Sequence, residues 1–77
     1  MKVWLTHTQK TLVQAAVLAQ DRKDWALEHL GCRDDLEFLE EHGFVETRRK
    51  RGVAWIAFRC PPGRIVLKLH DGYHLAV

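Results

Sequence analysis

The chain has 77 residues, of which 47% are hydrophobic and 29% charged, and its formal net charge is +2. These values are typical of one small globular domain and argue against a disordered chain. The apolar runs are far too short to cross a bilayer, and the N-terminal stretch lacks a secretory hydrophobic region, so we expect a cytoplasmic protein without a membrane segment. Two cysteines, Cys32 and Cys60, fit reduced thiols better than a disulfide framework.

The charge is unevenly spread along the chain. Residues 1–23 carry a net charge of +3, residues 24–46 carry −7 and residues 47–77 carry +6, which sum to +2. We therefore expect a basic and an acidic face or edge, unless the fold brings the blocks together as ion pairs.

The first predicted helix lies in the N-terminal block. Residues 2–5 suit a short edge strand or an extended lead-in. Thr6 with Gln9 forms a capping-box pattern, with Thr8 as an alternative N-cap. Apolar residues then recur on one helical face, which predicts a helix over about residues 8–20.

Two shorter helices are predicted in the acidic block. Asp24 can cap a helix over about residues 25–30. Asp34 as N-cap, with Glu37 three positions later, forms a second capping box and predicts a helix over residues 34–42.

The apolar period changes to two after Gly43. Gly43 followed by Phe44 is typical of a Schellman stop, in which the glycine adopts a left-handed backbone and the next residue packs back on the helix. Two alternating stretches within residues 44–58 flank a basic tip with Gly52, which predicts a β-hairpin.

A second hairpin is predicted at the C-terminal end. The Pro-Pro-Gly run at residues 61–63 ends the preceding strand, because proline cannot donate to a sheet ladder. Asp71-Gly72 is a strong type I′ turn signal between two further strands. The order of elements predicts an α+β domain over residues 1–77. The predicted core consists of Leu12, Ala16, Leu27, Leu30, Leu36, Leu39, Phe44, Ile56 and Phe58.

The layout "LTHTQKTLVQAAVLA…DWALEHLG…LEFLEEHGFVETRRKRGVAWIAF" resembles the winged helix-turn-helix superfamily, and in particular small bacterial regulators of the MarR and ArsR type. The resemblance implies a three-helix winged helix-turn-helix with a β-hairpin wing over residues 1–59, followed by an added C-terminal hairpin over residues 60–77. It also implies double-stranded DNA binding in transcriptional control.

The chain departs from that family in its recognition helix. The stretch before "LEFLEE" is shorter by about four residues, or one helical turn. The missing part is the turn whose side chains normally meet base edges, and its place is taken by Arg33, Asp34 and Asp35. We therefore expect no base-reading residue in this helix.

The leading candidate site is the basic tip of the predicted wing. Consecutive cations on a projecting hairpin suit phosphates or a minor groove, with a further cation on the first helix. The alternative is a solvated turn that keeps a strand edge soluble. The predicted DNA-binding residues are Arg48, Arg49, Lys50, Arg51 and Lys10.

The acidic third helix supports a competing function. Its carboxylates would oppose the phosphate field of DNA, so they could instead bind a basic protein partner, as in a small inhibitor of the type that mobile elements encode. They could also pair with the chain's own wing or with that of a sister subunit in a homodimer, or simply form a soluble outer face. The predicted protein-partner residues are Asp34, Asp35, Glu37, Glu40, Glu41 and Trp55.

Two tryptophans receive different predictions. Trp25, at the start of the second helix, is expected in the core. Trp55 faces outward if Ile56 and Phe58 face inward, because side chains alternate along a strand. An outward tryptophan beside a basic tip could stack on a base or fill a partner's pocket, although we favour its being covered by the second hairpin.

No catalytic or metal site is predicted. The sequence has no Ser-His-Asp set, phosphate-binding loop or dinucleotide motif, so we expect neither an enzyme nor a cofactor. His29 and Cys32 form a possible ligand pair, but a zinc site needs about four converging ligands and no second close pair completes it.

Overall fold

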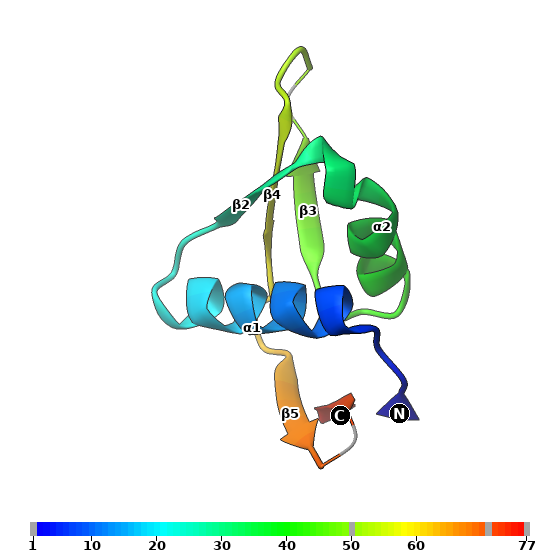
Figure 1. Cartoon of the computed structure of the whole chain (residues 1–77). Coiled ribbons are helices and arrows are strands. Elements are labelled where there is room, and N and C mark those ends of the chain that lie inside the picture. Colours follow the sequence, from blue (N-terminus) through cyan, green and yellow to red (C-terminus); the bar gives the residue numbers. More distant parts are fainter. Residues whose placement is uncertain (1, 50, 71, 77) are drawn as a thin grey trace.

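The fold consists of two antiparallel three-stranded sheets and two α-helices within the residues that the computed structural model describes, which are 2–49, 51–70 and 72–76 (Figure 1). Sheet A has the strand order β1-β6-β5, and sheet B has the order β2-β4-β3. The elements are β1 (Lys2–Val3), α1 (His7–Asp21), β2 (Ala26–His29), the 3-10 helix η1 (Leu30–Cys32), α2 (Arg33–Glu41), β3 (Glu46–Arg49), β4 (Trp55–Arg59), β5 (Ile65–Leu69) and β6 (Gly72–Ala76).

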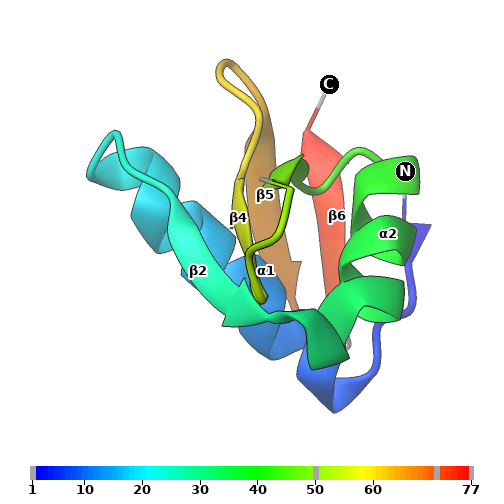
Figure 2. The same cartoon turned by 90° about the horizontal axis from the view of Figure 1, so that it is seen from above.

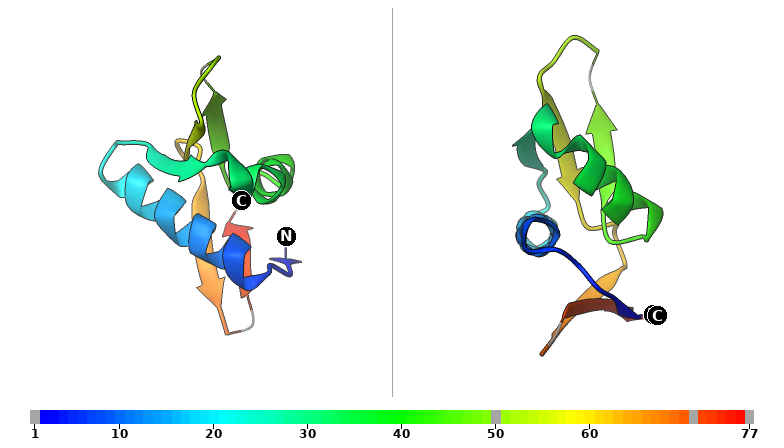
Figure 3. Two further views of the ribbon diagram at one scale, coloured as in Figure 1. Left: turned by 45° about the horizontal axis from the view of Figure 1, so that its top comes forward. Right: turned by 45° about the vertical axis from the view of Figure 1, so that its right-hand side comes forward.

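The molecule is elongated, with extents of 38 × 24 × 17 Å. The β3–β4 hairpin projects at one end, sheet A lies at the other end, and α1 crosses between them (Figures 1 and 3). Seen from above, β2 and α2 lie on opposite sides of the β3–β4 hairpin (Figure 2). None of the described helices is long and apolar enough to span a membrane.

The predicted α+β class is correct, but the three-helix winged helix-turn-helix is wrong. The segment predicted as a helix over residues 25–30 forms strand β2, which pairs antiparallel with β4 and places Leu27 opposite Ala57. Asp24 does not cap a helix; its carboxylate accepts a hydrogen bond from the Trp25 N–H at 2.8 Å. Pairing with the open edge of β4 overrides a weak local helix preference, as tertiary context commonly does.

The capping box of α1 is confirmed. The Thr6 N–H donates to Gln9 Oε1 at 3.0 Å, and the Gln9 N–H donates to Thr6 Oγ1 at 3.2 Å, so the helix begins at His7. At the other end Lys23 has a φ of +55°, and the Asp24 N–H donates to the Ala19 carbonyl at 2.8 Å. This Schellman turn directs the chain back towards sheet B.

Of the predictions for the two ends of α2, the one for the start is wrong and the one for the end is confirmed. The second capping box is wrong, because α2 continues from η1, begins at Arg33 and has no side-chain cap. The predicted stop is confirmed: Gly43 has a φ of +83°, and the Phe44 N–H donates to the Leu39 carbonyl at 2.9 Å. Gly43 is needed here because a β-carbon disfavours this left-handed backbone.

The core joins α1, α2 and the inner faces of both sheets. Leu27 and Leu30, two of the predicted core residues, are 65% and 39% exposed because they lie on β2 and η1 rather than on a packed helix. The predicted core residues that are buried are Leu12, Ala16, Leu36, Leu39, Phe44, Ile56 and Phe58.

The second hairpin is confirmed as β5 and β6, although Gly72 belongs to a strand and not to the turn. Leu69 pairs with Gly72, which is the first residue of β6. Asp71, the other half of the predicted turn, lies outside the described residues. The edge of β6 not used by β5 pairs with β1, which places the first strand beside the last (Figure 1).

Candidate nucleic-acid interface

The β3–β4 hairpin carries the predicted basic site. Arg48 and Arg49 end β3 and are exposed, and Arg51 is exposed in the turn beyond them. Lys50 lies outside the described residues. The β3–β4 hairpin extends beyond both helices at this end of the molecule (Figure 3).

The two faces of sheet B differ because side chains alternate along each strand. Ile56 and Phe58 point inward and are buried against the helices, as predicted. Trp55 and Ala57 point the other way, opposite His29 and Leu27 of β2. We call this second surface the outer face of sheet B. Its residues are Trp25, Leu27, His29, Arg48, Val53, Trp55, Ala57 and Arg59.

On the inner side, an acidic residue of α2 neutralises part of the hairpin. Arg49 Nη2 lies 3.0 Å from Glu37 Oε1, and Arg33 Nε lies 3.0 Å from the same oxygen. Hydrogen bonds from Arg33 and then Arg49 hold the pKa of Glu37 below its ordinary value. The acidic and basic blocks therefore meet within the chain on this side.

Two further carboxylates of α2 make hydrogen bonds inside the chain. Glu40 Oε2 accepts from the Thr47 N–H at 2.9 Å and from its hydroxyl at 2.6 Å, which ties α2 to β3. Asp35 Oδ1 accepts from Gln9 Nε2 at 3.2 Å, which ties α2 to α1. Asp34 and Glu41 remain exposed. Asp35, Glu37 and Glu40 therefore have structural roles within the chain that require no partner.

On the outer face, Trp25 is flanked by two arginines. The Arg59 guanidinium lies 4.3 Å from the Trp25 ring centroid, and that of Arg48 lies 5.3 Å from it. Arg59 also pairs with Glu46 at 2.6 Å. The prediction of Trp25 in the core is wrong, because the residue precedes β2 and its indole stacks under these cations instead.

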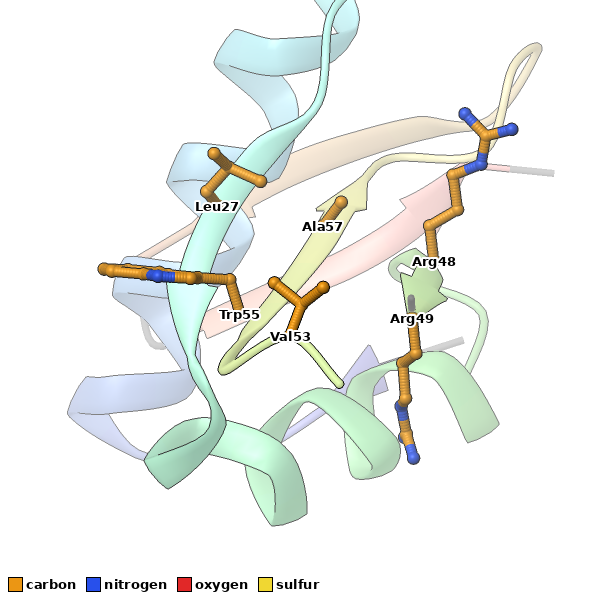
Figure 4. A pocket seen from close by; sticks show the side chains of 6 residues that line it. All are labelled: Leu27, Arg48, Arg49, Val53, Trp55 and Ala57. Carbon is orange, nitrogen blue, oxygen red and sulfur yellow. The ribbon is translucent and has the colours of Figure 1, made fainter. Parts of the chain in front are cut away.

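The outer face of sheet B contains an open groove of about 440 Å³ (Figure 4). Trp55 and Leu27 extend on its β2 side, and Arg48 and Arg49 extend in opposite directions on its β3 side. The Arg49 guanidinium is the one held by Glu37. The groove is lined by Leu27, Arg48, Arg49, Val53, Trp55 and Ala57.

Trp55 is 49% exposed, so the expectation that the second hairpin covers it is wrong. That hairpin pairs with β1 at the opposite end of the molecule (Figure 1). Trp55 also lies on the opposite face of sheet B from the carboxylates of α2, so the predicted protein-partner set is not brought together as one surface. Lys10 is likewise apart from the hairpin, because α1 crosses the far end of sheet B.

Several residues of the outer face were missed because the helix predicted over residues 25–30 concealed them. The alternation of Trp25, Leu27 and His29 was the available signal, since it has the period of a strand. Arg59 could not be found from sequence, because its role depends on the register that sets β4 beside β2.

The possible ligand pair of His29 and Cys32 does not gain the further ligands of a metal site in the part of the chain that the structure describes. The His29 Nδ1 accepts from the Gly31 N–H at 3.2 Å, and the ring meets Trp55 edge-on at 5.8 Å. Within residues 2–49, 51–70 and 72–76, no group of three or more His, Cys, Asp or Glu side chains is placed to hold a metal ion. Cys60 is buried, and burial raises the pKa of its thiol to about 11.

No protein-family model, curated protein or solved structure matches the chain. The resemblance to winged-helix regulators stays a prediction.

Proposed function

We propose that this protein is a non-enzymatic nucleic-acid-binding protein that contacts backbone phosphates through the β3–β4 hairpin. One observation carries the proposal: Arg48 and Arg51 of this hairpin are exposed, and neither forms an ion pair with a carboxylate among the described residues. Cations presented in this way attract a polyanion and release its counterions on binding. Double-stranded DNA, the ligand implied by the family resemblance, is the first to test.

The charge and position of α2 support the expectation that this helix does not read the base sequence of a duplex. Asp34 and Glu41 are exposed on α2, and Glu37 neutralises Arg49 on the side of the hairpin that faces this helix. A duplex approaching α2 would meet negative charge, whereas one approaching the hairpin tip would meet positive charge. We expect binding with weak sequence preference and a steep salt dependence.

The test compares two double variants with the same change in charge. R48A/R51A removes cations from the hairpin, and R64A/K68A removes exposed cations from the region of sheet A. Fluorescence anisotropy with a labelled random duplex, titrated at several salt concentrations, should show that only R48A/R51A lowers the log–log salt slope, by up to about 1.8 for two contacts. Equal effects of the two variants would contradict the proposal.

The competing function is binding of a basic protein partner through α2. It has less support, because Asp35, Glu37 and Glu40 already bond within the chain. If no nucleic acid binds to the unmodified protein even at low salt, while gel filtration shows it folded and unaggregated, the protein-partner function takes precedence.

A further inference from the structure

The outer face of sheet B combines aromatic and cationic side chains on a surface that no other described element covers. Leu27 of β2, Trp55 of β4 and Val53 in the segment before β4 are 65%, 49% and 42% exposed, and all three line one groove. Arg48 lies on the neighbouring strand of the same face. An apolar surface bordered by arginines suits a ligand that is both flat and anionic.

Trp55 offers a stacking surface on this face. Its ring meets His29 edge-on, with an interplanar angle of 83°, and half of the residue remains exposed. Figure 4 shows the indole extended along the β2 side of the groove, opposite Arg48. A base stacked on a protein aromatic ring gains affinity whatever its identity, because every base has a π-face.

Arg48 is held in position before any ligand arrives. Its guanidinium lies over Trp25, which also holds Arg59, so the two cations share one indole. Arg59 is neutralised by Glu46, whereas Arg48 has no carboxylate partner among the described residues. Arg48 is therefore the cation of this face that is available to a phosphate, and its contact with the ring lowers the entropy lost on binding.

We propose that the outer face of sheet B binds single-stranded nucleic acid, with one base stacked on Trp55 and the adjoining phosphates at Arg48 and the hairpin tip. The proposal rests on the function proposed above and names the form of nucleic acid that the site favours. The bases of a duplex are stacked inside the helix and cannot reach an indole on a flat sheet, whereas the bases of a single strand can. DNA and RNA share this chemistry.

The test uses tryptophan variants at the two ends of the molecule. W55A removes the stacking surface, and W4A removes a tryptophan that is 72% exposed and follows β1. Anisotropy is measured with labelled ten-nucleotide oligo(dT) and oligo(U) and with a duplex of equal length. W55A should weaken single-strand binding by about 5- to 100-fold, with a much smaller effect on the duplex, and W4A should change neither.

A second pair of variants guards against a change in folding. W55F keeps an aromatic ring and should retain most of the single-strand affinity. L27E puts a carboxylate in the groove at a residue that is already 65% exposed, so the fold should survive while single-strand binding falls. The preference of oligo(dT) over oligo(U), or the reverse, then shows which of the two sugars the face accepts better.

The outcomes separate the two proposals. If the duplex binds through Arg48 and Arg51 but W55A and L27E leave single-strand binding unchanged, the stacking proposal is overturned and the hairpin function stands. The same holds if W55A weakens single strand and duplex equally. If neither form binds at low salt, both proposals fail.

Discussion

The two sheets are built alike but expose different chemistry. Each has three antiparallel strands, with one face packed on the core and the other open. The open face of sheet A presents the aliphatic side chains of Ile65 and Leu67, which are 58% and 44% exposed. The outer face of sheet B presents tryptophan together with arginine. The difference teaches that exposure alone does not mark a nucleic-acid site, because the outer face of sheet B combines its exposed apolar side chains with arginines that can meet a phosphate.

Charge reversal at the two ends should give the largest effect. R48E/R51E replaces the attraction of the hairpin by repulsion, so duplex binding at low salt should fall by about 100-fold or more, since even neutralising a phosphate contact is costly. R64E/K68E makes the same change near sheet A and should reduce binding by only a few-fold through net charge. Anisotropy measures both, and circular dichroism checks that each variant is folded. A larger loss for the sheet A variant would reverse the comparison.

Two glycines with similar backbones should differ in the cost of a β-carbon. Gly43 and Gly52 have φ values of +83° and +80°. A β-carbon at Gly43 would lie 3.2 Å from Leu75 Cδ1 in sheet A, whereas one at Gly52 would meet nothing within 4 Å. In both G43A and G52A the strained backbone should lower the free energy of unfolding by about 1 kcal/mol. G43A should be destabilised further, because its β-carbon would press on Leu75.

Thermal unfolding measures this difference. For a domain of this size, 1 kcal/mol lowers the melting temperature by about 4–8 °C, so G43A should melt below G52A, and G52A below the unmodified protein. Equal melting temperatures for the two variants would show that the junction between α2, sheet B and Leu75 is looser than the structure indicates.

Releasing Arg49 from α2 should strengthen binding modestly. E37Q removes the charge that holds Arg49, and E41Q removes an exposed charge from the same helix without breaking an ion pair in the described chain. Both variants gain one unit of net charge, so any extra affinity of E37Q for a duplex reports the two arginines that Glu37 no longer holds, Arg49 and Arg33. We expect a gain of about 2- to 5-fold over E41Q. No difference between them would mean that Arg49 does not reach the ligand.

The contribution of Glu37 to the stability of the fold should depend on pH. Because the folded-state pKa of Glu37 is lowered, its contribution to stability is present at neutral pH and is lost as the pH falls below the ordinary glutamate value and through the lowered one. Stability measured by denaturant titration across this acidic range should therefore decline less in E37Q than in the unmodified protein. An equal decline would mean that the bonds to Arg33 and Arg49 contribute nothing.

The smallest expected effect is a difference in reactivity between the two cysteine thiols. Cys60 is fully buried with its pKa raised to about 11, whereas Cys32 is half-buried with its pKa raised less, first by burial and then by Glu28 and Asp35. Under native conditions at pH 8, a disulfide reagent should modify Cys32 before Cys60, because the thiolate is the reactive form. The variants C32A and C60A assign the two thiols, and faster reaction of Cys60 would contradict its burial.

The parts of the fold that were predictable from the sequence are those set by local signals. The Thr6–Gln9 capping box, the stop at Gly43 and the change of apolar period after it each depend on neighbouring residues. β2 was not predictable in this way, because Ala26–His29 becomes a strand only by pairing with β4, which lies about thirty residues further along the chain.

The candidate nucleic-acid interface was also predictable only in the features that local sequence sets. The basic run at the hairpin tip and the outward side chain of Trp55 could be predicted from composition and alternation. Which arginines are ion-paired and which are not could not be predicted from the sequence. Glu37 reaches Arg49 from another element, and Trp25 reaches Arg48 across the sheet. Tertiary contacts decide which cations remain free for a ligand.

The most direct test of a nucleic-acid surface on sheet B uses the indole N–H resonances of the three tryptophans. ¹H–¹⁵N spectra are recorded while oligo(dT) is added, with resonances assigned from W4A and W55A. Trp55 should shift most, Trp25 should shift less because it lies beneath Arg48, and Trp4 should not move. A shift concentrated at Trp4, or no shift at Trp55 under conditions where the oligonucleotide binds, would contradict the assignment of this face.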